Sequence, residues 1–147
     1  MHNNNVCKFP PHIISNDLSV FCFVLETNMD TMRQTMPLTS HRMILVEQGE
    51  GDFVFDGLPC HFSAGTLVFG FEGETFSLSS GDDVRYLYIN FSGSRGQALC
   101  ARLGISPASR KLEGMNALIP FCKECLLSTP PENVDLIRIL LCYSRKL

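Results

Sequence analysis

The segment formed by residues 84–91 carries polar aromatic side chains on one face. Its alternation is typical of a β-strand, in which successive side chains point to opposite faces. Tyr86, Tyr88 and Asn90 therefore share one face, and the other parity is apolar. Two hydroxyl-bearing rings beside an amide could line a pocket. The alternative is that the tyrosines fill a core, because a half-buried tyrosine usually finds a hydrogen-bond partner for its hydroxyl.

A C-x-x-C pattern formed by Cys122 and Cys125 is a second arrangement that could do chemistry. A zinc site needs about two further ligands at suitable spacing, and none is evident. A thioredoxin-like pair would open a helix after a strand. This pair instead falls inside a predicted helix, on the same apolar face as Leu118 and Phe121. We therefore interpret it as helix packing.

The composition is typical of one globular, cytoplasmic domain. The 147 residues are 45% hydrophobic and 18% charged, which argues against disorder. The seven cysteines are odd in number and lie mostly within apolar runs, which favours reduced thiols and a cytoplasmic location. The net charge of −3 does not predict a nucleic-acid-binding surface. No apolar run approaches the ~18 residues of a membrane helix, and the start does not resemble a signal peptide.

Residues 18–92 have the pattern of an all-β domain. Runs of β-branched and aromatic residues alternate with turn residues about every 8–12 positions, which is typical of a sandwich or barrel. The strongest turn is Asp56-Gly57, because both central residues of a type I′ hairpin need positive φ. The predicted strands are residues 18–26, 42–47, 52–55, 58–62, 66–71, 75–78 and 84–91.

The pattern after residue 92 is helical. Ser94 and Gln97 fit an S-x-x-Q capping box at the start of a first helix. A linker-like stretch follows over residues 106–114, and a second helix is predicted over residues 118–127. A third helix, over residues 129–147, has a broad apolar face. Such a face could cover the barrel and also meet its twin in a homodimer.

Three motifs resemble, in order, the N-terminal domain of AraC-type transcription regulators. Residues 41–57 (HRMILVEQGEGDFVFDG) resemble the first half of its cupin barrel, and residues 64–74 (AGTLVFGFEGE) resemble the turn and strand that follow. Residues 86–93 (YLYINFSG) and the later Leu103-Gly104-Ile105 resemble the family's final strand and its L-G-I. The resemblance implies a mainly β fold with C-terminal helices: a cupin-like double-stranded β-barrel (jelly roll) followed by about three α-helices.

The resemblance also implies a domain organisation and a function. We expect an N-terminal arm over residues 1–17, the cupin barrel over residues 18–92 and a helical dimerisation segment over residues 93–147. Such a domain binds a small-molecule effector and forms a homodimer through its helices. DNA is bound by a C-terminal helix-turn-helix domain, absent from this chain, which is consistent with the net charge of −3. Residues 1–11 could act as an arm over the pocket.

Catalytic cupins resemble one another in a His-x-His…Glu cluster and a later histidine that hold a metal ion. In this chain those positions fall near Thr35 and Pro37, on Arg42 and on Phe76, and none of these residues binds a divalent cation as imidazole or carboxylate would. His41 is one residue from the glutamate position and has the opposite strand parity, so we expect it to point away from the barrel centre. We expect no metal, no cofactor and no catalytic residue.

The resemblance implies five effector-binding residues: Arg33, Arg42, Phe76, Tyr86 and Tyr88. Arg42 and Phe76 fall where cupins point side chains into the barrel, and the two tyrosines match inward positions of the sugar-binding member. Arg33 lies near the strand position from which that member directs an arginine to its ligand. A guanidinium beside stacking rings suits a small polyol, sugar or carboxylate. The alternative is that both arginines lie on a solvated edge and the rings only fill the barrel.

Two other functions remain open from the sequence. One is a stand-alone metal-dependent cupin enzyme, which would contain bound metal. The other is a dimerisation module that binds no ligand.

Overall fold

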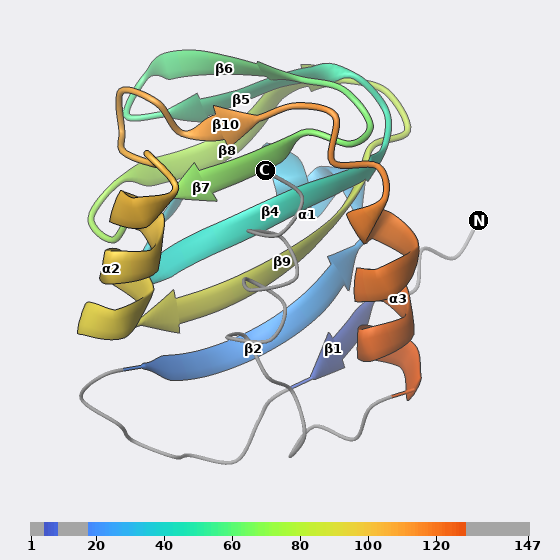
Figure 1. Cartoon of the computed structure of the whole chain (residues 1–147). Coiled ribbons are helices and arrows are strands. Elements are labelled where there is room, and N and C mark those ends of the chain that lie inside the picture. The colour runs from blue at the N-terminus through green and yellow to red at the C-terminus, as the bar shows by residue number, and fades with distance from the viewer. Residues whose placement is uncertain (1–4, 9–17, 129–147) are drawn as a thin grey trace.

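Two antiparallel sheets face each other in the computed structural model, which describes residues 5–8 and 18–128 (Figure 1). The strand order is β1-β2-β9-β4-β7-β10 in the six-stranded sheet and β3-β8-β5-β6 in the four-stranded sheet. The six-stranded sheet consists of β1 (Val6–Lys8), β2 (Ser19–Glu26), β9 (Arg85–Ser92), β4 (His41–Gln48), β7 (Leu67–Gly70) and β10 (Lys111–Leu112). The four-stranded sheet consists of β3 (Met36–Pro37), β8 (Thr75–Gly81), β5 (Gly51–Phe55) and β6 (Leu58–Phe62).

The mainly β fold with C-terminal helices is confirmed, and every predicted strand is present. The hairpin between β5 and β6 turns at Asp56 and Gly57, whose φ angles of 48° and 79° are the positive values that a type I′ turn requires. β8 extends to Gly81, three residues past its predicted end at Leu78. Four elements were not predicted, namely β1, β3, β10 and a short helix after β2.

Strand alternation divides the side chains of the six-stranded sheet between two cores. Tyr86 of β9 and Ile44 of β4 belong to the inner core, between the sheets, whereas Leu87 and Ile89 belong to the outer core. Aromatic rings of the four-stranded sheet dominate the inner core, and these rings are Phe53, Phe55, Phe62 and Phe76. They pack in contact, with the Phe53 and Phe62 centroids 4.2 Å apart. The four-stranded sheet therefore lines its side of the barrel mainly with aromatic rings.

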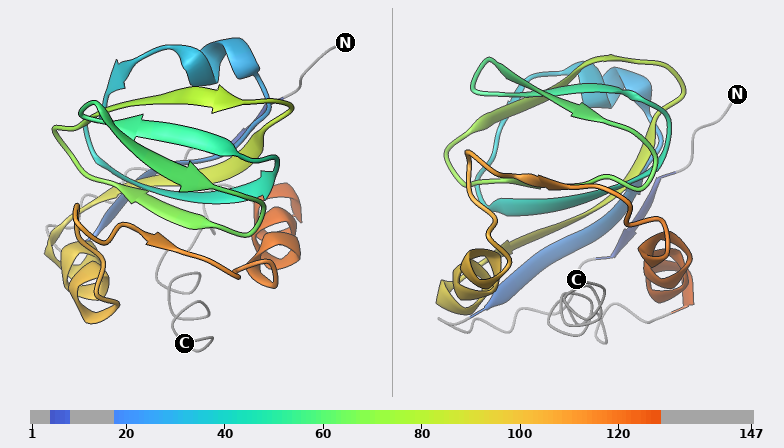
Figure 2. Two further views of the ribbon diagram at one scale, coloured as in Figure 1. Left: turned by 90° about the horizontal axis from the view of Figure 1, so that it is seen from above. Right: turned by 45° about the horizontal axis from the view of Figure 1, so that its top comes forward.

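Two helices pack against the outer face of the six-stranded sheet (Figure 2). They are α2 (Ser94–Arg102), which contributes Cys100, and α3 (Leu118–Ser128), which contributes Cys122 and Leu126. A third helix, α1 (Met29–Arg33), connects β2 to β3 and buries Met32 in the inner core. None of the helices that the structure describes is long and apolar enough to cross a membrane. The C-terminal helix predicted over residues 129–147 lies outside the described residues.

The local structure differs from the prediction at two places after the barrel. The capping box is wrong: the N-cap of α2 is Gly93, which has φ of 113° and provides no side-chain cap, and Ser94 is already helical. The Gln97 amide instead lies 3.4 Å from Nε2 of His41. Residues 106–114 are more than a linker, because β10 within them pairs with β7. At the other end of the chain, β1 lies within the predicted arm and pairs with β2.

Candidate functional site

Arg42 brings a charged group into the barrel near the start of β4. Its side chain shares the inward parity of Ile44 and is only 5% exposed. Its Nε donates a hydrogen bond to Oδ1 of Asn90, the residue opposite it on β9, at 2.8 Å. The guanidinium stacks on the ring of Tyr88, 4.0 Å from the centroid, and lies 5.7 Å from that of Phe76. Three of the predicted effector-binding residues thus form one cluster.

Tyr86 lies next to this cluster along β9. Its ring centroid is 5.9 Å from that of Tyr88 and 5.6 Å from that of Phe53, and the residue is 2% exposed. Burial raises the pKa of its hydroxyl far above the ordinary value, and the positive charge of Arg42 opposes that shift. The hydroxyl therefore stays protonated at physiological pH, and it can both donate and accept a hydrogen bond.

Arg33 does not join the cluster. It is the last residue of α1 and is exposed, whereas the prediction put it near a strand that faces the ligand. The helix forms because the Asn28 side chain caps it, accepting hydrogen bonds from the backbone N–H groups of Asp30 and Thr31. An asparagine before a short helical stretch is a sequence signal that could have identified this helix.

Met36 and Asn90 also contact Arg42, and neither was predicted to bind the effector. Sδ of Met36 lies 3.7 Å from Nη1 of Arg42, and Met36 is 37% exposed on the edge strand β3. Strand parity already placed Asn90 on the face of the two tyrosines. No sequence pattern predicted that Met36 contacts Arg42, because the position of Met36 depends on the pairing of β3 with β8.

A second arginine, Arg110, lies against the barrel at the edge where β10 pairs with β7. Its terminal nitrogens donate to the two carboxylate oxygens of Glu74 at 2.8 and 2.7 Å. Its guanidinium lies 4.2 Å from the ring centroid of Phe55, and the Phe55 and Phe76 rings are 5.1 Å apart. A continuous series of cation–π and ring contacts therefore connects Arg42, through Phe76 and Phe55, to Arg110. The prediction missed this pair because it treated residues 106–114 as a linker.

Two predictions about residues outside the barrel interior are confirmed. His41 faces away from the interior: Nδ1 accepts the backbone N–H of Glu72 at 3.1 Å, and the ring packs against Phe71. Cys122 and Cys125 both lie in the outer core, so α3 uses the C-x-x-C pair for packing.

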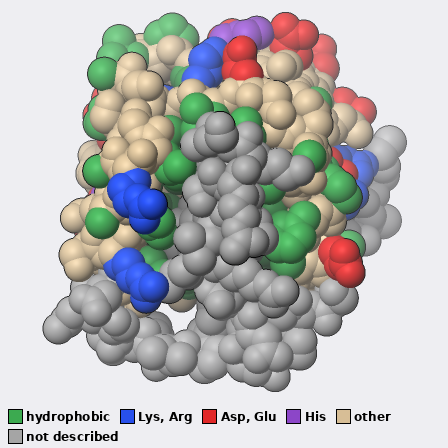
Figure 3. Space-filling view, viewed as in Figure 1, with side chains coloured by type: hydrophobic (Ala, Val, Ile, Leu, Met, Phe, Trp, Pro, Cys, Tyr) green, Lys and Arg blue, Asp and Glu red, His purple; other side chains and the backbone are tan. Residues whose placement is uncertain are grey.

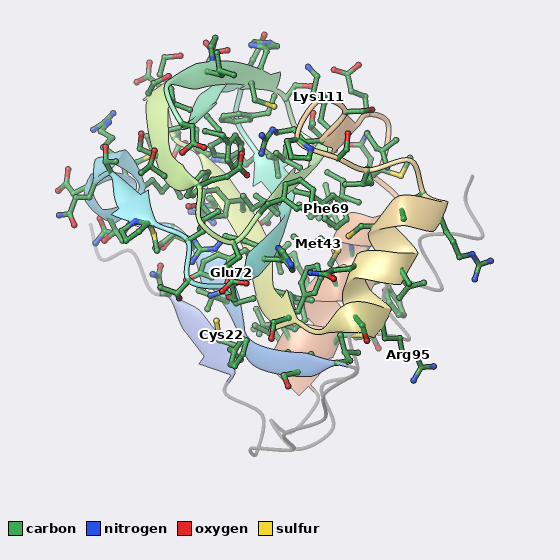
Figure 4. All side chains as sticks on the ribbon, turned by 90° about the vertical axis from the view of Figure 1, so that its left-hand side faces the viewer. Cys22, Met43, Phe69, Glu72, Arg95 and Lys111 are labelled. Carbon is green, nitrogen blue, oxygen red and sulfur yellow. The ribbon has the colours of Figure 1, made fainter. Side chains whose placement is uncertain are left out.

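Charged and histidine side chains that do not point into the barrel lie mainly on the molecular surface. Acidic and histidine side chains lie along the upper edge of the molecule in Figure 3. His61 lies 3.1 Å from Glu50 and 3.3 Å from Asp52, and all three belong to β5, β6 and the turn before β5. Arg95 of α2 extends away from the body of the molecule (Figure 4). Across residues 5–8 and 18–128, no group of three or more His, Cys, Asp or Glu side chains is arranged to hold a metal ion.

The fold defines a cupin-like barrel with helices packed on one of its sheets. Residues 28–135, more than half of the chain, match the family described as the AraC-like ligand binding domain. The chain belongs to this family of ligand-binding domains. No curated protein sequence matches it.

Solved structures with a similar architecture include three from different organisms. The EutQ protein of Clostridium difficile has 21% identity and a TM-score of 0.39, over 56% of this chain and 57% of that one. The cupin domain of Cnp3 from Schizosaccharomyces pombe has 14% identity and a TM-score of 0.42, over 68% and 72%. ToxT from Vibrio cholerae O395, bound to (E)-4-(8-methylnaphthalen-1-yl)but-3-enoic acid, has 12% identity and a TM-score of 0.45, over 97% and 53%. The chain thus spans little more than half the length of EutQ or ToxT.

Proposed function

We propose that this chain is the effector-sensing and dimerisation domain of an AraC-type transcription regulator. It binds a small polar metabolite in its barrel and has no catalytic role. DNA is contacted by a helix-turn-helix domain outside these residues, and the protein acts in the cytoplasm. The family match supports the ligand-binding role, and the net charge of −3 is consistent with DNA contacts elsewhere.

The observation that carries the proposal is the polar cluster inside a barrel whose core is mainly apolar. Arg42, Asn90 and Tyr88 bring a guanidinium, an amide and a phenol together where the two sheets face each other. Ligand sites commonly combine apolar walls with a few convergent polar groups. The inner core supplies the walls, and this cluster supplies the polar groups.

Contacts between neighbouring side chains support a physical route from this cluster towards the helices. The series of cation–π and ring contacts from Arg42 through Phe76 and Phe55 ends at Arg110, in the segment between α2 and α3. A ligand that changes the position of Arg42 would change the packing along this series. It can shift the population of two states only by its different affinity for them. We propose that these states differ in how the helices present the dimer interface.

Ligand binding is tested by thermal unfolding in the presence of sugars, polyols and small organic acids. A ligand that binds only the native protein must raise the melting temperature as its concentration increases. We expect at least one class to do so in the wild type and not in Arg42→Met. If no compound in the panel shifts the melting temperature, the result favours a dimerisation module without ligand. Metal analysis of the purified protein tests the remaining alternative, since stoichiometric Fe, Mn, Ni or Zn would favour a cupin enzyme.

Dimerisation and the regulator assignment have separate tests. Size-exclusion chromatography with light scattering should give the mass of a dimer at micromolar concentration, and a monomer throughout would contradict the proposal. A pair of helix-turn-helix patterns in the residues encoded after Leu147 would support the regulator. A reading frame that ends there would contradict it.

A further inference from the structure

Arg42 is a buried cation whose described contacts are all neutral. Its partners are the Asn90 amide, the Met36 sulfur and the rings of Tyr88 and Phe76. Among the described residues, no Asp or Glu forms an ion pair with it. A buried charge without a counter-ion is costly to keep in a folded protein. The cluster therefore holds a positive charge that has no ion-pair partner among the described residues.

Two carboxylates of the barrel, those of Glu74 and Glu26, already accept hydrogen bonds from other groups. Glu74 binds Arg110 through both oxygens. Glu26 lies opposite Tyr86 in the pairing of β2 with β9, four residues along β9 from the partner of Arg42. It accepts hydrogen bonds from Asn5 and from backbone N–H groups that follow it in the chain. Neither carboxylate forms an ion pair with the Arg42 guanidinium.

Arg110 shows how the same fold accommodates a buried guanidinium with a structural role. The two arginines stack on rings at nearly equal distances, 4.0 Å for Arg42 on Tyr88 and 4.2 Å for Arg110 on Phe55. Arg110 also has a bidentate carboxylate partner, whereas Arg42 has no carboxylate partner within the part of the chain that the structure describes. The two sites therefore differ in the anion: Arg110 has the carboxylate of Glu74, and the Arg42 site has no equivalent among the described residues.

The part of the Arg42 guanidinium that remains for a ligand is the edge formed by Nη1 and Nη2. Tyr88 covers one face of the guanidinium and Asn90 accepts a hydrogen bond from Nε. Among residues 5–8 and 18–128, the hydrogen-bonding contact of this edge is the one of 3.7 Å with Met36. A thioether is a weak acceptor on a flexible side chain, and Met36 lies partly exposed on an edge strand. It can move aside with little disturbance of the inner core. Two adjacent N–H groups in one plane match the two oxygens of a carboxylate.

We propose that the effector is an organic acid, and that its carboxylate binds the Nη1–Nη2 edge of Arg42 in place of the Met36 sulfur. This inference rests on the proposed function and specifies its ligand class. The carboxylate neutralises the buried charge, and the rings of Phe76 and Tyr88 contact the remainder of the molecule. A neutral sugar could accept hydrogen bonds from the same edge but would leave the charge unbalanced.

The test uses two pairs of probes that differ mainly in charge: D-glucuronate against D-glucose, and benzoate against benzamide. Binding is measured by thermal shift and by titration calorimetry with the wild type, Arg42→Met, Arg42→Lys and Arg33→Met. We expect at least one acid to bind more tightly than its neutral counterpart. Arg42→Met should weaken that acid by about 10- to 100-fold, the range for hydrogen bonds to charged groups. Arg42→Lys keeps the charge but loses the planar fork, so its affinity for the acid should lie between those of the wild type and Arg42→Met. Arg33→Met, a substitution at an exposed residue, should bind the acid like the wild type.

The outcomes separate this inference from the proposed function. If neutral probes bind as tightly as the acids, or if Arg42→Met leaves acid binding unchanged, the carboxylate assignment is wrong while an effector-binding barrel stands. If none of the four probes binds, the carboxylate assignment is also contradicted. The wider panel of sugars and polyols then decides the proposed function on its own.

A second measurement needs no ligand. Without its anion, Arg42 is a buried unpaired charge, so Arg42→Met should melt at the same temperature as the wild type or higher. Arg110→Met should melt at a lower temperature, because Glu74 loses its partner. If the two substitutions lower the melting temperature equally, Arg42 has the structural role of Arg110, and the inference fails.

Discussion

The carboxylate of Glu74 holds the guanidinium of Arg110 by two hydrogen bonds of 2.8 and 2.7 Å, and so joins the turn before β8 to the segment between α2 and α3. The side chains are only 11% and 12% exposed. The Arg110 guanidinium also contacts the ring of Phe55, which places this ion pair directly against the inner core. It is therefore a buried polar connection between the barrel and the segment that joins α2 to α3.

Breaking this ion pair should destabilise the protein strongly. In Glu74→Gln the buried guanidinium keeps its charge and loses its counter-ion, so the free energy of unfolding should fall by about 3 kcal/mol. Urea denaturation measures the change. The matched control is Glu72→Gln in the same turn, where the side chain is exposed, and it should change the free energy by less than about 0.5 kcal/mol. Equal effects of the two substitutions would contradict a structural role for the pair.

The close packing around Gly70 should not tolerate a methyl group. Gly70 pairs with Arg42 in the β4–β7 register, and a Cβ there would lie 2.6 Å from Cδ1 of Leu38 and 2.9 Å from Cε1 of Phe55. Gly70→Ala should lower the free energy of unfolding by about 1–3 kcal/mol, the usual cost of overpacking. Urea denaturation measures this, and a variant as stable as the wild type would show that both side chains can move at no cost.

Alkaline pH should destabilise the native protein through Cys100. Burial raises the pKa of its thiol from 9.0 to about 11, so the unfolded chain loses this proton at lower pH than the native protein. The associated stability is fully present below about pH 9 and is lost as the pH rises towards 11. Tyr86 should also make the native protein less stable at alkaline pH, because burial raises the pKa of its hydroxyl as well. Urea denaturation at pH 8, 9.5 and 10.5 should show a decline that is smaller in Cys100→Ala; an identical decline would contradict the assignment to this thiol.

Asn5 should contribute modestly to stability by connecting the N-terminal segment to the end of β2. Its Oδ1 accepts the backbone N–H of Thr27 at 2.8 Å and the hydroxyl of Thr27 at 3.1 Å, and its amide nitrogen donates to Glu26. Thr27 is 7% exposed, so water would replace these bonds only in part. Asn5→Ala should lower the free energy of unfolding by about 1 kcal/mol, and amide exchange at Thr27 should accelerate. Unchanged exchange at Thr27 would mean that the contact does not persist in solution.

The sequence was enough to predict features that depend on neighbours along the chain. A strand repeats every two residues, so Tyr86, Tyr88 and Asn90 could be assigned to one face, and His41 to the opposite face from Arg42. The Asp56-Gly57 turn was predictable for the same local reason, because few residue pairs accept positive φ twice. The mainly β fold followed from these repeated patterns.

The electrostatic character of the site was decided only by the tertiary structure. Whether a buried arginine meets a carboxylate depends on which strands and segments become neighbours, and residues distant in sequence supply these partners. Arg110 meets Glu74 because β10 adds to the edge of β7, and Arg42 meets Asn90 and Met36 across two different sheets. Arg33, which the resemblance had grouped with Arg42, instead ends a helix that the Asn28 cap begins. Sequence patterns identify which side chains point inward, but only the packed sheets determine which of those charges remain unpaired.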